Sequence, residues 1–277
     1  MQQQADRRRR IRRVLGALVA TLIAVYIVKG LALYAFQRHF LYVPPSREVA
    51  APKDFTVVQT STADGLHLQA WFSPPKGKKP VILSFHGNGD DLMSASIVAP
   101  YFRGHGYGVF LCEYRGYSGN PGEPTEEGLY ADARACVDWL KQHGYGAERL
   151  VLHGHSLGTG VAVQMASEIQ SKFLILESAF TSIADMAREK YPAYPIELMI
   201  RDRFDSLSKI GKIKADLLMV HGALDGLIPI EMGHRLFDAA NRPKTFVTVK
   251  DAGHNDLYLH DGGNKVMDWL DKQAKDK

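Results

Sequence analysis

The segment Gly154-His155-Ser156-Leu157-Gly158 decides the fold of this chain, because it follows the apolar run 150–152 and opens a segment with helical character. A serine on a sharp turn between a strand and a helix is pushed out of the sheet. Glycines are needed on both sides of it, because a Cβ at either position would collide with the neighbouring strand or helix. The segment therefore predicts a nucleophile elbow at Ser156, provided that its surroundings agree.

Short apolar runs alternate with helical patterns on both sides of this turn. Two extended runs at 55–60 and 66–72 are typical of an antiparallel start. Six further runs, rich in Val, Ile, Leu and Phe as buried parallel strands are, lie at 80–85, 108–113, 149–153, 172–177, 215–220 and 244–249. Helical patterns lie near 90–104, 125–143, 157–170, 230–241 and 256–274. The alternation predicts one α/β domain with a mostly parallel eight-stranded sheet and helices on both faces.

One connection is too long for a simple crossover between strands. Residues 178–214 carry several aromatic side chains between Tyr191 and Phe204, together with Pro192 and Pro195. We interpret this segment as a small cap over the strand ends. A helical insertion without a role at the site explains its length equally well.

The N-terminal region joins a basic segment to a long apolar one. Residues 1–13 contain six Arg and one Asp, and residues 14–36 contain one charged residue, Lys29. As a helix, the latter 23 residues span roughly 35 Å, enough for a hydrocarbon core of roughly 30 Å. The pattern predicts an uncleaved transmembrane signal anchor. A cleaved signal peptide is the alternative, but the segment is longer than a usual h-region and no small-x-small cleavage site follows it.

The basic residues also predict an orientation. Because the arginines precede the span, residues 1–13 are expected in the cytoplasm. Residues 37–54, which contain three prolines, are expected to form a stalk. Residues 55–277 are then expected to form the α/β domain on the other side of the membrane, which is periplasmic in a bacterium and lumenal or extracellular elsewhere.

Charge and cysteine content exclude other classes of partner. The formal net charge of +4 comes from the N-terminal arginines, so the rest of the chain is close to neutral and offers no basic stripe for nucleic acid. The two cysteines, Cys112 and Cys136, have apolar surroundings and are expected to be buried and unpaired. The sequence does not specify an oligomeric state.

Polar residues follow the apolar runs where parallel strands end, which is the edge at which open α/β sheets bind ligands. Ser156, Asp225 and His254 each follow such a run, in that order along the chain. A serine hydroxyl needs a base to remove its proton, and the base needs a carboxylate to fix its tautomer. We therefore expect Ser156 as nucleophile, His254 as base and Asp225 as orienting acid. Asp205 and Asp251 compete for the last role, but Asp205 falls in the cap segment and Asp251 stands only three residues before His254.

The turn His86-Gly87-Asn88-Gly89 supplies the remaining part of such a site. The backbone N–H groups of Asn88 and Leu157 are expected to bind the oxyanion of a tetrahedral intermediate. His153 and His155 stand two residues apart, but no cluster of carboxylates or cysteines accompanies them, so no metal site is expected. This chemistry needs neither a metal nor an organic cofactor.

Together these motifs resemble those of the α/β-hydrolase superfamily of serine hydrolases. The matching segments are Phe85-His86-Gly87-Asn88-Gly89, Tyr114-Arg115-Gly116-Tyr117-Ser118-Gly119, Gly154-His155-Ser156-Leu157-Gly158, Glu177-Ser178-Ala179-Phe180-Thr181-Ser182, Arg203-Phe204-Asp205-Ser206, His221-Gly222-Ala223-Leu224-Asp225 with Pro229, and Gly253-His254. Over residues 55–272 the chain is similar to a membrane-anchored subgroup of depalmitoylating thioesterases, lysophospholipid lipases and serine aminopeptidase-like proteins. The resemblance implies cleavage of an acyl ester or thioester, in a lipid or an acylated protein, through an acyl-enzyme on Ser156.

Two other functions stay open at this point. A peptidase with the same three residues would need an acidic cluster near the cap to bind a free α-amine, and the sequence shows no clear one. A catalytically silent membrane scaffold would keep the fold without the activity. One departure from the subgroup is the pair Asp90-Asp91 beside the oxyanion turn, which disfavours acidic substrates.

Overall fold

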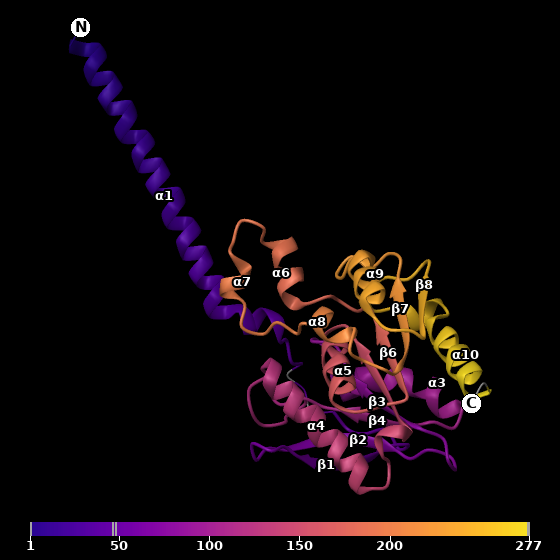
Figure 1. Ribbon diagram of the computed structural model, residues 1–277. Helices are drawn as coiled ribbons and strands as arrows, with labels where there is room; N and C mark the ends of the chain where they lie inside the picture. Colours follow the sequence, from indigo (N-terminus) through magenta and orange to yellow (C-terminus); the bar gives the residue numbers. More distant parts are fainter. Residues whose placement is uncertain (1, 46, 48, 276–277) are drawn as a thin grey trace.

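Eight strands form a single sheet in the computed structural model, which describes residues 2–45, 47 and 49–275 (Figure 1). Their spatial order is β1 (Thr56–Ser61), β2 (His67–Ser73), β4 (Gly108–Cys112), β3 (Val81–Phe85), β5 (Leu150–His155), β6 (Phe173–Glu177), β7 (Asp216–Gly222) and β8 (Lys244–Val249). Strand β2 pairs antiparallel with β1 and β4, and the other neighbours are parallel. The predicted sheet is confirmed. Positions 1, 46, 48, 276 and 277, which belong to the predicted N-terminal segment, stalk and domain, lie outside the described residues.

The central strands are apolar throughout because helices cover both faces of the sheet. Leu83 on β3 belongs to a buried cluster with side chains of α4 (Glu126–Gln142), α5 (Leu157–Glu168) and α9 (Ile230–Ala239). Its neighbour Ile82 belongs to a second cluster with side chains of α3 (Ala99–Gly104) and α10 (Gly262–Lys275). Successive side chains on a strand point to opposite faces, and here both faces meet helices.

The helix predicted at 90–104 is divided into two. Helix α2 (Leu92–Ala95) continues through a 3₁₀ turn at Ser96–Val98 into α3, and Pro100 lies in the first turn of α3. A proline lacks an N–H that would be unpaired in this position anyway, so the chain starts a new helix there. Two further 3₁₀ turns, Ala147–Arg149 and Leu257–His260, precede β5 and α10.

Three short helices lie between β6 and β7, in the segment predicted as a cap. They are α6 (Ile183–Lys190), α7 (Ile196–Met199) and α8 (Leu207–Ile210). Helix α8 packs on α5 and α9, whereas α6 and α7 stand beside the end of the N-terminal helix (Figure 1).

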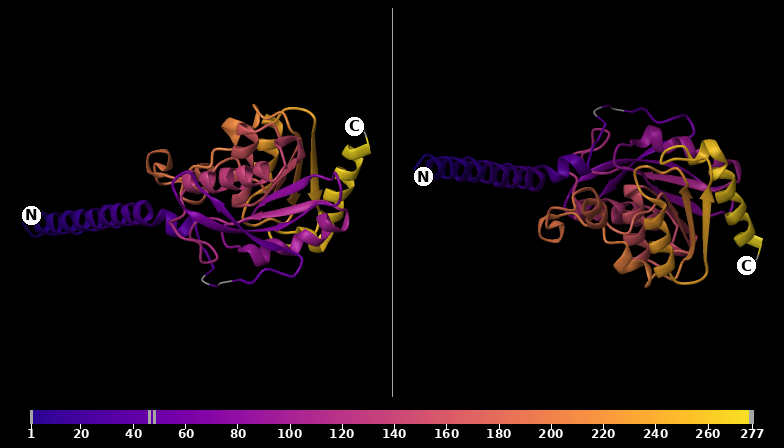
Figure 2. Two further views of the ribbon diagram at one scale, coloured as in Figure 1. Left: turned by 90° about the horizontal axis from the view of Figure 1, so that it is seen from below. Right: turned by 90° about the horizontal axis from the view of Figure 1, so that it is seen from above.

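The N-terminal helix α1 (Gln2–Leu41) contains the whole predicted span 14–36 and projects away from the domain (Figure 2). It extends beyond that span in both directions, through the arginines and into the predicted stalk 37–54. It is the one helix of the described chain that is long and apolar enough to cross a membrane. The next residue, Tyr42, is already buried in the domain core.

Cys112 and Cys136 form a disulfide between β4 and α4, so the prediction of two unpaired cysteines was wrong. Both residues are buried, as expected, and their Cα atoms lie 6.3 Å apart. The pair forms because the apolar face of α4, which includes Leu129 and Ala133, packs on the sheet beside β4. A sequence separation of 24 residues does not reveal which helix crosses which strand.

Candidate active site

Ser156 lies on a sharp turn between β5 and α5. Its backbone has φ 51° and ψ −120°, a conformation that strains any residue other than glycine. A Cβ at Gly154 would collide with the main chain of Gly158, and a Cβ at Gly158 would collide with the carbonyl of Phe85. The Ser156 N–H donates to the carbonyl of Glu177 at the end of β6 (3.0 Å). The two glycines and this hydrogen bond hold the turn at the strand-end edge.

Ser156, His254 and Asp225 lie in one hydrogen-bonded line. Nε2 of His254 lies 2.9 Å from Oγ of Ser156, and Nδ1 of His254 lies 2.8 Å from Oδ2 of Asp225. The three residues follow β5, β8 and β7, so three different strand ends contribute to the line. When the carboxylate accepts a hydrogen bond from Nδ1–H, Nε2 is left as the acceptor that faces the serine hydroxyl.

The carboxylate of Asp225 is buried and held from several sides. Its Oδ1 accepts hydrogen bonds from the N–H groups of Leu227 (2.9 Å) and Ile228 (2.8 Å), and its Oδ2 lies 3.4 Å from Nε2 of His221. Burial alone would raise the pKa of Asp225. The hydrogen bonds from His221, His254 and the loop outweigh burial and hold this pKa well below its ordinary value. Asp225 is therefore ionised at neutral pH.

The other residues considered for this site are not part of the hydrogen-bonded line. Asp205 accepts a hydrogen bond from the first turn of α8, and Asp251 is exposed. His153 is buried and hydrogen-bonds a serine hydroxyl through Nδ1 (2.9 Å), and Nε2 of His155 donates to the carbonyl of His254 (3.1 Å). Within the described residues no group of three or more His, Cys, Asp or Glu is arranged to hold a metal ion.

Asn88 and Leu157 line the same cavity as Ser156. Leu157 is the first residue of α5, where an N–H has no acceptor within its own helix. The carbonyl of Asn88 accepts from Tyr117 Oη (2.9 Å) and from the Val43 N–H (3.2 Å), and its side chain donates to the carbonyl of Leu41 (2.9 Å). These bonds fix the turn and leave the Asn88 N–H without a partner among the described residues.

A buried acid supports the start of this turn. Oε1 of Glu113 lies 2.6 Å from Nε2 of His86, and the hydroxyl of Tyr114 donates to the His86 carbonyl (3.0 Å). Burial alone would lower the pKa of His86, but the charge and hydrogen bond of Glu113 outweigh it and raise this pKa. The end of β3 is therefore held by a hydrogen-bonded pair of buried side chains as well as by packing.

The two acidic residues beside the turn have different environments. Asp91 is the N-cap of α2 and pairs with Arg47 (2.6 Å). Asp90 lies in a small recess of about 150 Å³ that it shares with His155 and Ser156. Of these two acidic residues, Asp90 is the one that shares a recess with the serine.

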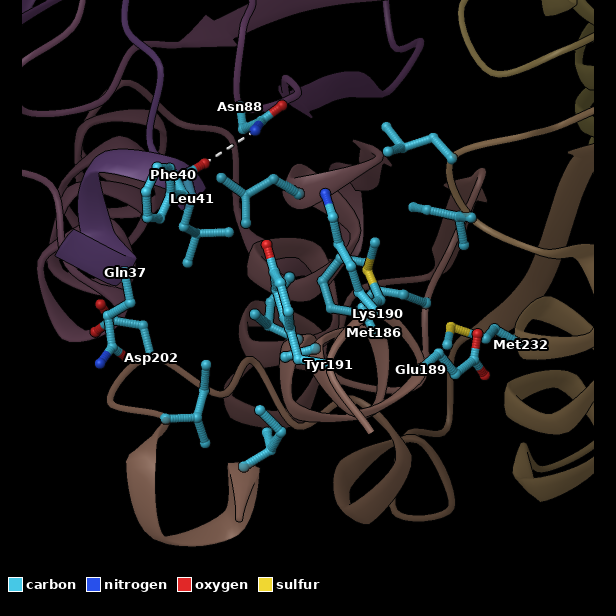
Figure 3. Close-up of a pocket in the computed structure, with 18 of the residues that line it drawn as sticks. Gln37, Phe40, Leu41, Asn88, Met186, Glu189, Lys190, Tyr191, Asp202 and Met232 are labelled. Carbon is cyan, nitrogen blue, oxygen red and sulfur yellow. Dashed lines mark hydrogen bonds between the residues drawn. The ribbon is translucent and has the colours of Figure 1, made fainter. Parts of the chain in front are cut away.

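An apolar pocket of about 570 Å³ opens beside Ser156 (Figure 3). Its volume falls within the range of about 300–1,000 Å³ that is usual for small-molecule sites. The cap contributes Ile183, Met186 and Tyr191, and the loop after β7 contributes Leu227. Because the cap segment lines the pocket, a role at the site is favoured over an insertion without one.

Helix α1 contributes a part of this pocket that was not predicted from the sequence. Leu33, Tyr34, Gln37, Phe40 and Leu41 all line it. Their spacing of three and four residues places them on one face of the helix. The span before them is apolar on every side, so Gln37 is the one residue of this set that hints in the sequence at a face in contact with protein.

Proteins with similar sequences include uncharacterized proteins and a protein with an alpha/beta hydrolase domain, and solved structures with a similar fold include an esterase. The family model described as alpha/beta hydrolase fold matches residues 80–195. The uncharacterized protein Rv2307c of Mycobacterium tuberculosis is 36% identical over 256 residues, which cover 89% of this chain and 91% of that protein. Human alpha/beta hydrolase domain-containing protein 17B is 33% identical over 224 residues, which cover 78% and 73% of the two chains. The esterase Pf2001 of Pyrococcus furiosus superposes with a TM-score of 0.68 at 20% identity, over 83% of this chain and 98% of that chain, which shows a shared fold.

Proposed function

Because the chain belongs to the α/β-hydrolase family, we propose that it is a membrane-anchored serine hydrolase that cleaves carboxylic esters or thioesters of acyl chains. The proposal is supported above all by the hydrogen-bonded line of Ser156, His254 and Asp225 at the edge of an apolar pocket. The pocket suits an acyl chain, and the position beside it suits a polar carbonyl. An acyl lipid or an acylated protein presents both.

In the first half of the proposed reaction, Ser156 Oγ attacks the substrate carbonyl while Nε2 of His254 takes the hydroxyl proton. Asp225 stabilises the imidazolium that forms. The N–H groups of Asn88 and Leu157 donate to the oxyanion of the tetrahedral intermediate, and each such donor is worth about 10²–10³ in rate. The intermediate collapses to an acyl-enzyme, and His254 gives its proton to the departing alcohol or thiol.

In the second half, a water molecule takes the place of the leaving group. His254 accepts a proton from this water as it attacks the acyl-enzyme carbonyl, and then returns that proton to Ser156 Oγ. The products are a free carboxylic acid and the original enzyme. No step requires a metal or an organic cofactor.

Labelling with a fluorophosphonate probe, followed by a substrate panel, tests the proposal. The panel contains an acyl ester, a lysophospholipid, an acyl thioester and an aminoacyl amide. We expect labelling of the protein and turnover of esters or thioesters. Absence of labelling would identify a silent scaffold, and faster turnover of the amide would identify a peptidase.

We also propose the orientation in the membrane. The six arginines of residues 1–13 keep the N-terminus in the cytoplasm, residues 14–36 cross the bilayer, and residues 37–54 connect the span to the hydrolase domain of residues 55–277, with its cap at 178–214. The domain then lies in the periplasm of a bacterium, or on the lumenal or extracellular side in another cell. The Cys112–Cys136 disulfide supports this side, because disulfides persist in oxidising compartments.

A further inference from the structure

We infer that α1 is a wall of the acyl-binding pocket as well as an anchor, and that the far end of a bound acyl chain lies against Leu33 and Tyr34. The inference rests on the proposed function and specifies its substrate. That substrate is an ester or thioester whose acyl chain is embedded in the bilayer.

The pocket follows the last turns of α1. Leu41 lies at its inner end, where its carbonyl accepts a hydrogen bond from the side chain of Asn88, and Figure 3 shows both next to Phe40. Leu33 lines the same cavity eight residues earlier, which is roughly 12 Å along the helix. The cavity therefore extends from the serine along α1 towards the apolar span.

The cap fixes the outer part of this wall. The ring of Tyr194 stacks on that of Tyr26, with centroids 4.7 Å apart, and the Tyr26 hydroxyl donates to the carbonyl of Ala193 (2.7 Å). Gly30 permits this approach, because a Cβ there would lie 3.0 Å from the Tyr194 ring. These contacts hold the outer part of α1 against the cap.

Polar contacts fix the inner part of the wall. The side chain of Gln37 donates to the carbonyl of Met199 (3.0 Å) and accepts from the N–H of Arg201 (2.7 Å). Arg38 and Asp202 form an ion pair (2.7 Å), in which the carboxylate is buried. Side chains that are hydrogen-bonded to a cap main chain have a defined position, so α1 forms a fixed surface and not a loose tether.

The outer end of the pocket lies within the segment expected to cross the membrane. Leu33 and Tyr34 belong to residues 14–36, and the cap contact at Tyr26 lies ten residues before Phe36, roughly 15 Å along the helix. Leu198 on α7 is 85% exposed and adds an apolar side chain to the same part of the cap. A chain between α1 and the cap thus runs from the bilayer to Ser156 along a mostly apolar surface. The polar side chains of Gln37, Glu189, Lys190 and Asp202 also line the cavity.

Full-length protein in phosphatidylcholine vesicles tests the inference with two tryptophan variants. Leu33→Trp fills the outer pocket, whereas Leu31→Trp adds the same side chain at a position that is 63% exposed and does not line the pocket. The measurement is the ratio of kcat/KM for p-nitrophenyl palmitate to that for p-nitrophenyl butyrate. We expect Leu33→Trp to lower this ratio roughly 10- to 200-fold, as steric changes in apolar pockets do. Leu31→Trp should leave it at the wild-type value.

A third variant guards against misfolding of the first. Leu33→Ala enlarges the pocket and should shift the preference from palmitate towards stearate. In the same vesicles, hydrolysis of palmitoyl lysophosphatidylcholine is compared with hydrolysis of an S-palmitoyl peptide, which distinguishes a lipid substrate from an acylated protein. Leu33→Trp should slow hydrolysis of whichever of the two the wild type cleaves. Equal ratios in Leu33→Trp and Leu31→Trp, in an active wild type, would overturn the inference alone. A wild type that neither reacts with a fluorophosphonate nor hydrolyses any ester or thioester would overturn the proposed function, and this inference with it.

Discussion

Nδ1 of His155 lies 3.8 Å from Oδ2 of Asp90, so the residue before the candidate nucleophile is paired with a carboxylate that directly follows the turn at residues 86–89. Burial alone would lower the pKa of His155 and raise that of Asp90. Their mutual attraction, together with Glu177 acting on His155, outweighs burial, so the pKa of His155 is raised and that of Asp90 is lowered. The pair therefore contributes stability over a limited range of pH.

The stabilising effect of the His155–Asp90 pair should depend on pH. Because the pKa of His155 is raised from 6.5, its contribution is complete below that value and is lost as the pH rises through the folded-state pKa. Because the pKa of Asp90 is lowered from 3.8, its contribution is complete above that value and is lost only in stronger acid. Asp90→Asn should therefore lower the Tm more at about pH 5 than at about pH 9. Asp251→Asn, at an exposed position, is the control, and an Asp90→Asn effect that is the same at both pH values would contradict the pairing.

Ser156→Ala should abolish fluorophosphonate labelling and lower kcat by about 10³–10⁶, because the nucleophile is lost while binding groups remain. The variant should melt like the wild type, since the turn is held by its glycines and backbone. Ser178→Ala is a matched control, because Ser178 also has a φ of 51° at a strand end. Labelling that survives in Ser156→Ala, or disappears in Ser178→Ala, would assign the nucleophile to another residue.

Asp225→Asn should lower kcat by about 10⁴, because an amide in this position favours the wrong tautomer of His254. Steady-state kinetics of this variant are compared with those of Asp205→Asn and Asp251→Asn. Both controls should stay close to the wild type, since neither side chain contacts the imidazole. A larger loss in Asp251→Asn than in Asp225→Asn would show that the choice of acid is wrong.

The disulfide predicts a difference between oxidised and reduced protein. Closing a loop with a sequence separation of 24 residues is worth about 3.5 kcal/mol of unfolding free energy in the chain-entropy account. Reduction, or the double replacement of Cys112 and Cys136 by alanine, should lower the Tm accordingly. Alkylation of unfolded, non-reduced protein purified from membranes should modify neither cysteine, and modification of both would contradict the pair.

The proposed orientation predicts how the protein fractionates and where proteases reach it. Carbonate-washed membranes should retain it, and protease added to spheroplasts or intact cells should digest residues 55–272. Protection of this domain, while a known external marker is digested, would reverse the orientation. Release of soluble protein with a new N-terminus after residue 36 would identify a cleaved signal peptide.

The sheet and the order of the polar strand ends could be predicted from sequence because both depend on local patterns. A strand buried on both faces is an uninterrupted apolar run, as in Leu150-Val151-Leu152, and the residue after it lies at a known edge. The glycines around Ser156 indicate the turn, because the turn leaves no room for a Cβ at either position. These features need no information about distant parts of the chain.

The wall of the pocket and the disulfide could not be predicted in the same way. The position of α1 depends on Tyr194, Met199 and Asp202, which lie more than 150 residues from their partners on the helix. The pairing of Cys112 with Cys136 depends on how one helix crosses one strand. Both are tertiary contacts between distant segments, and the sequence of neither segment indicates its partner.

The continuity of α1 from Gln2 to Leu41 limits the reach of the enzyme. A flexible stalk would let the active site take many orientations relative to the bilayer, so that it could act on a second membrane or on lipid particles in solution. A helix that is joined to the cap by Gln37 and Arg38 and to the Asn88 side chain by Leu41 cannot move in that way. In the proposed orientation, such an enzyme acts in cis, on molecules that diffuse within its own leaflet, and its encounters are set by lateral diffusion rather than by diffusion through water.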